Sequence, residues 1–333
     1  AGKKVPGAVW GIASGDVDAA GAAEVILLER RRLRIGALGA DGLKEELSCS
    51  LPGLADGARV YAMDLDEKPG DEIVVSAVED GLPASMVLRL EGKECKALVV
   101  GAPLSLRVAE DAQGERKLFA QGWSSDSFFF GPVSEISLKE GKLKETAKLA
   151  LPWNTKLFRF TYLPVSDATR VALLPGYAPL EVRVATGKKF KRVWKSPARM
   201  GGSPNQLPAS QRDVLGSEDS DSVIFDIPPV AASVTGRTAV LAVQSAVPAK
   251  GVIGRKPGIS GSRVVGVVED AALGFVPNLS TVELPSCISD MIPLETQGAA
   301  GRIVVVMQDE CGMFDKPTES QIIAFDLPGL EVK

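Results

Sequence analysis

Short apolar runs recur along the whole chain and alternate with polar segments rich in Gly, Asp and Pro. Clear examples are residues 24–28, EVILL, and residues 72–78, EIVVSAV. Runs of this length are typical of β-strands, whereas helices need longer segments with apolar positions three and four residues apart. No window of 12 or more residues shows that helical spacing together with capping residues. The pattern therefore predicts an all-β protein.

The segment 59–78 repeats the segment 8–29. Each has an apolar run, an Asp-apolar-Asp turn, a nearby Gly, an acidic residue and a second apolar run. A repeat of about 50 residues indicates an array of small structural units.

Aligning the second apolar run of each repeat divides the chain into six units. These runs are 24–28, 72–78, 117–121, 170–174, 237–243 and 302–307. Each unit contains four short candidate strands, of which the second is almost continuously apolar and the fourth is often charged. Four strands per repeat are typical of a β-propeller blade, with the charged strand at the outer edge.

We therefore predict one domain, 1–333, that folds as a six-bladed β-propeller of four-stranded blades. The expected blades are approximately 8–54, 58–104, 105–153, 156–198, 222–285 and 286–333, and LEVK at 330–333 is expected to be the last outer strand. The alternative is a seven-bladed propeller, with a diverged blade hidden before the fifth unit.

Two long polar segments, 199–222 and 246–262, interrupt the array. Loops of this length are often functional, because they vary without disturbing the core. Segment 199–222 carries Glu218, Asp219 and Asp221, which suits a cationic partner. The alternative is an insertion without a role.

The acidic turns of the first two units resemble FG-GAP/VCBS repeats, with a remnant at Asp111 in the third unit. That family builds propellers related to the integrin α-subunit head and to many bacterial exported proteins. Its best-formed turns read D-x-D-x-D-G-x-x-D and hold Ca²⁺. The matching candidate ligands here are Asp16, Asp18 and Glu24 in the first unit, and Asp64, Asp66 and Asp71 in the second.

Each of these turns departs from the family pattern. Ala20 and Lys68 stand where a third acid belongs, although Ca²⁺ prefers six to eight oxygen ligands. The resemblance thus implies weak calcium binding at most, and we expect no other cofactor. The alternative is that these acids only cap backbone N–H groups of the turns.

Composition narrows the function. Of the 333 residues 45% are hydrophobic, the net charge is −4 and the pI is about 5.3, which argues against a nucleic-acid partner. The basic run 187–199 is interpreted as an outer edge strand, with a polyanion-binding patch as the alternative. No apolar stretch reaches 18 residues, so we expect no membrane span.

The chain contains no histidine, which excludes Ser-His-Asp catalysis and every His-ligated metal site. Glycosidases that use paired carboxylates stay possible. The aromatic run FFF at 128–130 is expected to pack between blades, and a carbohydrate or peptide groove is the alternative.

The four cysteines are Cys49, Cys95, Cys287 and Cys311, and none forms a CxxC pair. Cys287 and Cys311 belong to one unit and are candidates for a disulfide. Cys49 and Cys95 lie near outer strands of neighbouring units, and a bridge between any pair needs Cα atoms within about 7 Å. The alternative is four small buried side chains.

These observations favour a non-catalytic binding or scaffold propeller of the bacterial cell envelope, exported to the periplasm or cell surface. We expect loop tips on one face to recognise a protein or glycan partner. The alternative is a hydrolase or lyase that acts on polysaccharides with carboxylates at the channel mouth. The opening residues, AGKKVPG, lack the apolar core of a signal peptide. We expect a monomeric domain of a larger protein or complex.

Overall fold

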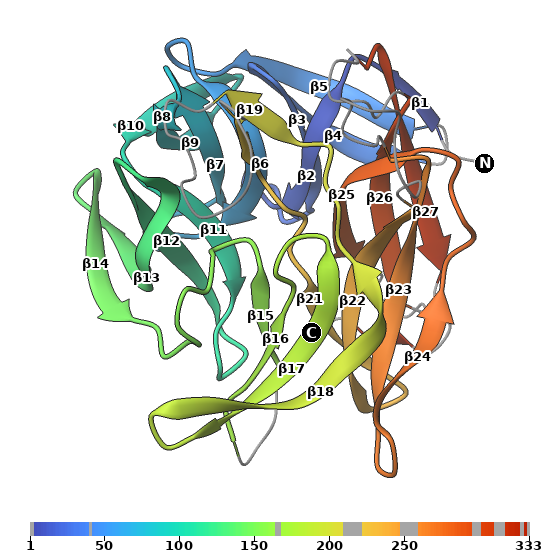
Figure 1. The fold of residues 1–333 in the computed structure, drawn as a ribbon. Coiled ribbons are helices and arrows are strands. Elements are labelled where there is room, and N and C mark those ends of the chain that lie inside the picture. The colour runs from blue at the N-terminus through green and yellow to red at the C-terminus, as the bar shows by residue number, and fades with distance from the viewer. Residues whose placement is uncertain are drawn as a thin grey trace.

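The computed structural model describes residues 3–39, 42–163, 168–208, 222–246, 259–294, 301–309, 317–326 and 330–331. Six antiparallel sheets stand in a ring around a central channel, and the described residues contain no helix (Figure 1). The prediction of a six-bladed β-propeller is therefore confirmed. Within the described chain, no helix is of a length and apolarity that would let it cross a membrane.

The blades follow the chain in the order of the predicted units. Blade 1 contains β2 (Val9–Gly15), β3 (Glu24–Glu29), β4 (Arg32–Gly39) and β5 (Gly42–Ser50). Blade 2 contains β6 (Asp56–Met63), β7 (Glu72–Glu79), β9 (Ser85–Glu91) and β10 (Glu94–Ala102), with the short β8 (Leu82–Pro83) beside β7. Blade 3 contains β11 (Ser105–Glu110), β12 (Arg116–Ser124), β13 (Ser127–Lys139) and β14 (Lys142–Lys148).

The other three blades repeat this order. Blade 4 contains β15 (Phe160–Leu163), β16 (Arg170–Leu173), β17 (Ala178–Thr186) and β18 (Lys189–Met200). Blade 5 contains β21 (Val230–Val234), β22 (Arg237–Ala246), β23 (Gly261–Asp270) and β24 (Gly274–Ser280). Blade 6 contains β25 (Cys287–Leu294), β26 (Arg302–Gln308) and β27 (Glu319–Asp326), and its outer strand is β1 (Lys3–Pro6).

The core lies between adjacent blades. Leu27 of β3 and Val304 of β26 share one buried cluster, and Val74 of β7 and Leu118 of β12 share another. The second strand of a blade is covered on both faces, which explains its continuous apolar sequence. The first strand of each blade lines the channel.

The ring closes through its N-terminal strand. β1 pairs antiparallel with β27, in a register that places Lys3 opposite Ile322, and Val5 is buried in the cluster that contains Ile322. The prediction that 330–333 is the last outer strand is wrong. β28 (Leu330–Glu331) instead pairs with β21, the innermost strand of blade 5.

The insertion before blade 5 is partly built into the fold. Its first residues, Arg199 and Met200, belong to β18, and a two-stranded sheet follows from β19 (Gln206–Pro208) and β20 (Ser222–Ile224). β19 crosses in front of the inner strands in Figure 1. Residues 209–221, with the predicted acidic contact residues, lie outside the described chain, as do residues 247–258 of the second insertion.

The two faces of the ring differ. On one face, where the inner strands begin, the β19–β20 hairpin lies over the channel, and we call it the cap face. On the opposite face, the turn face, the first and second strands of each blade are joined. The acidic turns of blades 1 and 2 belong to the turn face.

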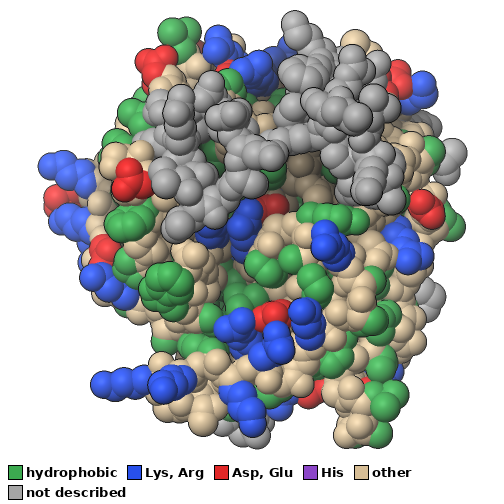
Figure 2. All heavy atoms as spheres, viewed as in Figure 1, with side chains coloured by type: hydrophobic (Ala, Val, Ile, Leu, Met, Phe, Trp, Pro, Cys, Tyr) green, Lys and Arg blue, Asp and Glu red, His purple; other side chains and the backbone are tan. Residues whose placement is uncertain are grey.

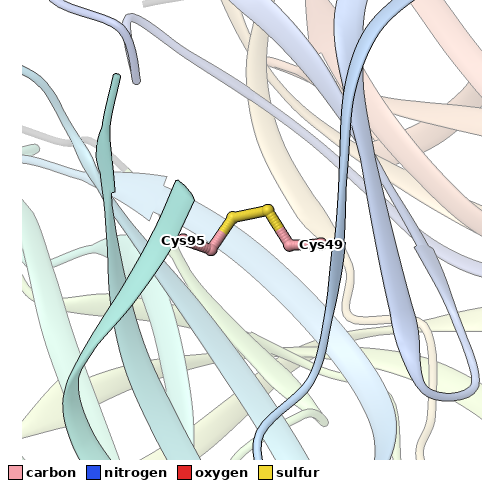
Figure 3. Close-up of a disulfide and its surroundings, with 2 residues drawn as sticks. All are labelled: Cys49 and Cys95. Atoms are coloured by element: carbon pink, nitrogen blue, oxygen red, sulfur yellow. A yellow bond between two sulfur atoms is a disulfide. The ribbon is translucent and has the colours of Figure 1, made fainter. Parts of the chain in front are cut away.

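A disulfide joins the outer strands of the first two blades. Cys49 of β5 and Cys95 of β10 are bonded, with their Cα atoms 6.0 Å apart (Figure 3). Cys287 is buried in β25 and is not a free thiol; Cys311, its candidate disulfide partner, lies outside the described residues.

Candidate functional site

The acidic turn of blade 1 brings its three predicted ligands together. Oxygen atoms of Asp16, Asp18 and Glu24 lie within 4.8 Å of one another. Glu24 accepts hydrogen bonds from the backbone N–H of Val17 (2.9 Å) and of Asp18 (3.4 Å). Burial raises the pKa of Glu24, although these hydrogen bonds oppose the shift, and the charges of Asp18 and Asp16 raise it further.

The other two acids in this turn also bond to backbone. Asp18 accepts from the N–H of Ala20 at 2.8 Å, and Asp16 Oδ2 accepts from the N–H of Gly21 at 3.0 Å. Asp16 Oδ1 is buried, and no described residue forms a hydrogen bond with it. The turn therefore caps its own backbone, as the alternative interpretation stated, and also gathers oxygen atoms that a cation could bind.

The acidic turn of blade 2 has the same construction but contains a protein cation. Asp64, Asp66 and Glu72 form the cluster, and Glu72 accepts from the N–H of Leu65 at 2.7 Å. Arg89 of β9 donates to Asp66 Oδ1 at 2.6 Å and, through its Nε, to Glu72 Oε1 at 3.0 Å. These bonds place a guanidinium among the carboxylates.

Arg89 affects its two partners differently. Its hydrogen bond lowers the pKa of Asp66 to about 2, with help from Lys68, whose ammonium lies 2.8 Å from Asp66 Oδ2. Glu72 is fully buried, and this burial raises its pKa despite the same arginine. The protein itself thus offsets part of the negative charge of the second turn.

Asp71, the third candidate ligand predicted for blade 2, does not belong to the metal-type cluster there. Its backbone N–H donates to the carbonyl of Asp16 at 2.7 Å, so Asp71 links the two neighbouring turns. Glu72 occupies the position in its turn that Glu24 occupies in the first.

The channel is a second candidate site. A pocket of about 300 Å³ opens to solvent and is lined by all six inner strands or the residues next to them. Its walls are mostly apolar, with a few polar groups, notably Tyr61, Arg107, Arg116 and Asp290. A mostly apolar cavity with a small number of converging polar groups is typical of ligand sites.

A buried network closes the channel toward the cap face. Arg59, 1% exposed, crosses from β6 to bond the carbonyls of Ser289 (2.8 Å) and Phe225 (2.7 Å), and its Nη1 lies 2.9 Å from Asp290 Oδ1. Asn205, fully buried, donates to the carbonyls of Trp10 and Ser289. The cap hairpin is therefore anchored by the ring itself.

Asp290 is a structural group in this network. Its Oδ1 accepts from Met291 N–H at 3.0 Å and its Oδ2 accepts from Ile12 N–H at 3.1 Å, in addition to the ion pair with Arg59. The other acid among the described channel-lining residues is Glu110.

A group of exposed aromatic side chains lies beside the cap hairpin. Trp153 is 93% exposed, Phe130 58% and Trp123 37%. Gln121 ties their segments together, because its amide donates to the carbonyls of Gly131 and Thr155. Figure 2, which views the cap face, shows hydrophobic side chains at the surface over this part of the ring.

The run at 128–130 divides between packing and exposure. The rings of Phe128 and Phe129 are buried and lie 5.7 Å from that of Phe225, which follows β20. The prediction that this run packs is confirmed for two of its three residues, whereas Phe130 points outward. The buried rings hold the cap hairpin next to the exposed aromatic group.

The sequence interpretation missed the charged residues that shape both sites. Arg59 and Arg107 each interrupt the first apolar run of a unit, in GARVYAM and SLRVAE. An arginine inside a predicted inner strand was the signal that could have identified them, since buried charges need partners. Arg89 gave no comparable signal, because it lies near the end of β9, where the charged residue Glu91 follows.

In comparisons of this chain with known proteins, no protein family and no characterised protein gives a match.

Proposed function

We propose that this protein is a non-catalytic binding propeller of the bacterial cell envelope, of FG-GAP/VCBS type, which recognises a protein or glycan partner through its cap face. The observation that carries the proposal is the exposed group Trp123, Phe130 and Trp153 beside an anchored hairpin. Exposed aromatic side chains of this size are enriched where proteins bind partners.

The construction of the hairpin supports the same face. Pro208 pairs with Ser222, so the two ends of segment 209–221 meet on a stem that buried side chains fix to the ring. A surface beside a stem that is already fixed to the ring loses little entropy when a partner binds. The disulfide between Cys49 and Cys95 supports an oxidising compartment outside the cytoplasm.

The experiment uses a panel of soluble polysaccharides in affinity electrophoresis, and crosslinking to bacterial envelope proteins as a second arm. We expect the wild-type protein to be retarded by a polysaccharide or to capture one defined protein. We expect the double variant Phe130→Ala/Trp153→Ala to lose that binding while it stays folded.

Two further variants sharpen this test. Val193→Ala removes a comparably exposed apolar side chain, 54% exposed, from the outer strand β18 and serves as the matched control. Deletion of residues 210–220 leaves the stem pairs and Asn205 in place. Equal loss of binding in the Val193→Ala control, or reducing sugar released from a polysaccharide by the purified protein, would contradict the proposal.

A further inference from the structure

The end of the channel where Arg59, Arg107 and Asp290 lie, which we call the inner end, contains a buried cation without a counter-charge. Arg107 is 3% exposed and lines the pocket, and its Nη1 donates to the carbonyls of Leu157 (2.8 Å) and Phe160 (2.6 Å). The guanidinium also lies 5.1 Å from the centre of the Phe160 ring. Its Nε is buried and has no partner within the part of the chain that the structure describes.

The charges nearby do not neutralise Arg107. It forms no ion pair with a carboxylate among the described residues, and the nearby guanidinium of Arg59 repels it. Asp290 already pairs with Arg59, so it does not provide a counter-charge for Arg107. Burial lowers the pKa of Arg107 to about 10, which leaves it charged at neutral pH.

Tyr61 adds a second unmet polar group to the same cavity. Its hydroxyl is buried and has no hydrogen-bond partner among the described residues. Burial raises the pKa of Tyr61 well above its usual range, so the phenol keeps its proton. The unmet groups of Arg107 and Tyr61 are thus N–H and O–H donors.

Unmet donors beside a guanidinium without an ion pair select an anionic acceptor. A carboxylate accepts several hydrogen bonds at once and would neutralise the buried guanidinium. A neutral sugar hydroxyl would accept hydrogen bonds but would leave the charge of the guanidinium in place. The pocket volume of about 300 Å³ accommodates a group the size of a monosaccharide or one amino-acid residue.

We propose that the inner end of the channel is a binding site for a carboxylate group, held by Arg107 and by the hydroxyl of Tyr61. The site is separate from the aromatic group of the cap face, so it does not depend on the function proposed above. The carboxylate belongs either to a uronic acid or to the free C-terminus of a peptide.

The test measures melting temperature in sodium acetate against sodium chloride at equal ionic strength and neutral pH. We expect about 100 mM acetate to raise the melting temperature of the wild-type protein by about 2–4 °C, because a ligand that binds only the native state stabilises it. Arg192→Met, which removes an exposed arginine of β18, is the control and should respond like the wild type.

Two variants of the site separate binding from folding. Tyr61→Phe removes a hydroxyl without a protein partner, so it should fold as well as the wild type and bind acetate about tenfold more weakly. Arg107→Met should abolish the acetate effect. If it fails to fold, Tyr61→Phe decides the question alone.

Titration with D-glucuronate against D-glucose, and with a dipeptide against its C-terminal amide, distinguishes the two sources. Tighter binding of the acid form in either pair, weakened by Tyr61→Phe, supports the proposal and identifies the source. An equal acetate response in wild type and Tyr61→Phe, or no response in the wild type, would overturn it. The latter result would assign the unmet donors to ordered water.

Discussion

Two turns that read alike in sequence have different electrostatics because of one residue outside them. The acids of blade 1 form no ion pair with a basic side chain among the described residues, whereas Arg89 lies between Asp66 and Glu72 in blade 2. A guanidinium in that position does part of what a metal ion would do, since it neutralises charge. It cannot supply the coordination geometry of a calcium site.

Replacing Arg89 should reveal how much the second turn depends on it. In Arg89→Met, the fully buried Glu72 keeps its backbone hydrogen bond but loses its cation, which should lower the free energy of unfolding by about 3 kcal/mol. Lys96→Met breaks the exposed pair with Glu91 in the same blade and should cost less than about 0.5 kcal/mol. Urea unfolding measures both variants, and similar costs would contradict this account.

Calcium provides a related comparison. The wild-type protein should show little or no change in melting temperature between about 1 mM Ca²⁺ and chelator, because one turn lacks ligands and the other already contains the guanidinium of Arg89. Arg89→Met should gain more from Ca²⁺ than the wild type does. A large upward shift in the wild type would show that the turn of blade 1, around Asp16 and Glu24, binds calcium well.

The raised pKa of Glu24 gives a pH prediction. Its folded-state pKa lies above the unfolded value, so its contribution to stability is complete below about pH 4 and is lost as the pH rises through the raised value. Glu24→Gln cannot ionise and should lack this loss. Chemical unfolding at several pH values between about 4 and 7 should therefore show a flatter stability profile for Glu24→Gln; parallel profiles would contradict the assignment.

At the scale of single strands, the sequence predicted which strand a residue belongs to but not which residue of another strand it contacts. It placed Cys49 and Cys95 near outer strands of neighbouring units, and the structure adds that their Cα atoms are 6.0 Å apart. The contact between Arg89 and Glu72 was hidden for the same reason. It depends on the register of β7 against β9, which no local pattern encodes.

The disulfide should contribute substantially to the stability of the first two blades. It closes a separation of 46 residues, for which the chain-entropy estimate is about 4 kcal/mol. Cys49→Ser, Cys95→Ser and the double variant should each lose a similar amount, because either single change breaks the same bond. Thiol titration of the unfolded, non-reduced wild type should find no more than two free thiols; four would remove the bridge.

The insertion before blade 5 shows where composition gives a wrong prediction. Its Gly, Ser and Pro content predicted a loop from 199 to 222, yet Leu207 and Asn205 are buried, and two strands of three residues form its stem. Strands this short give too few positions for a pattern to appear. Their stability comes from the aromatic residues beneath them, which belong to distant parts of the sequence.

For the whole molecule, the repeat predicted the number of blades but not how the ring closes. Six similar apolar runs were sufficient for the first result, because each reports burial within its own unit. Which strand pairs with β27 of the last blade depends on a contact between the two ends of the chain. The short runs KKVP and LEVK look equally suitable as an edge strand, and packing of Val5 against Ile322 decides between them.

This closure can be tested with one substitution. Val5→Asp places a charge in the buried cluster of β1 and should lower the free energy of unfolding by about 3 kcal/mol. Hydrogen exchange should quicken first in β27, which loses its partner strand. Lys4→Ala, at an exposed neighbouring position of the same strand, should change neither measurement appreciably; an equal effect would show that the strand contributes little.

The pairing of β1 with β27 also imposes an order in time. On the ribosome, Lys3 is made more than 300 residues before its partner Ile322, which at ordinary rates of synthesis is an interval of tens of seconds. Throughout that interval β1 is an edge strand without a neighbour, and an unpaired edge can join another chain. Refolding at high protein concentration should therefore favour a swapped dimer, in which β1 of one copy completes the sixth blade of another.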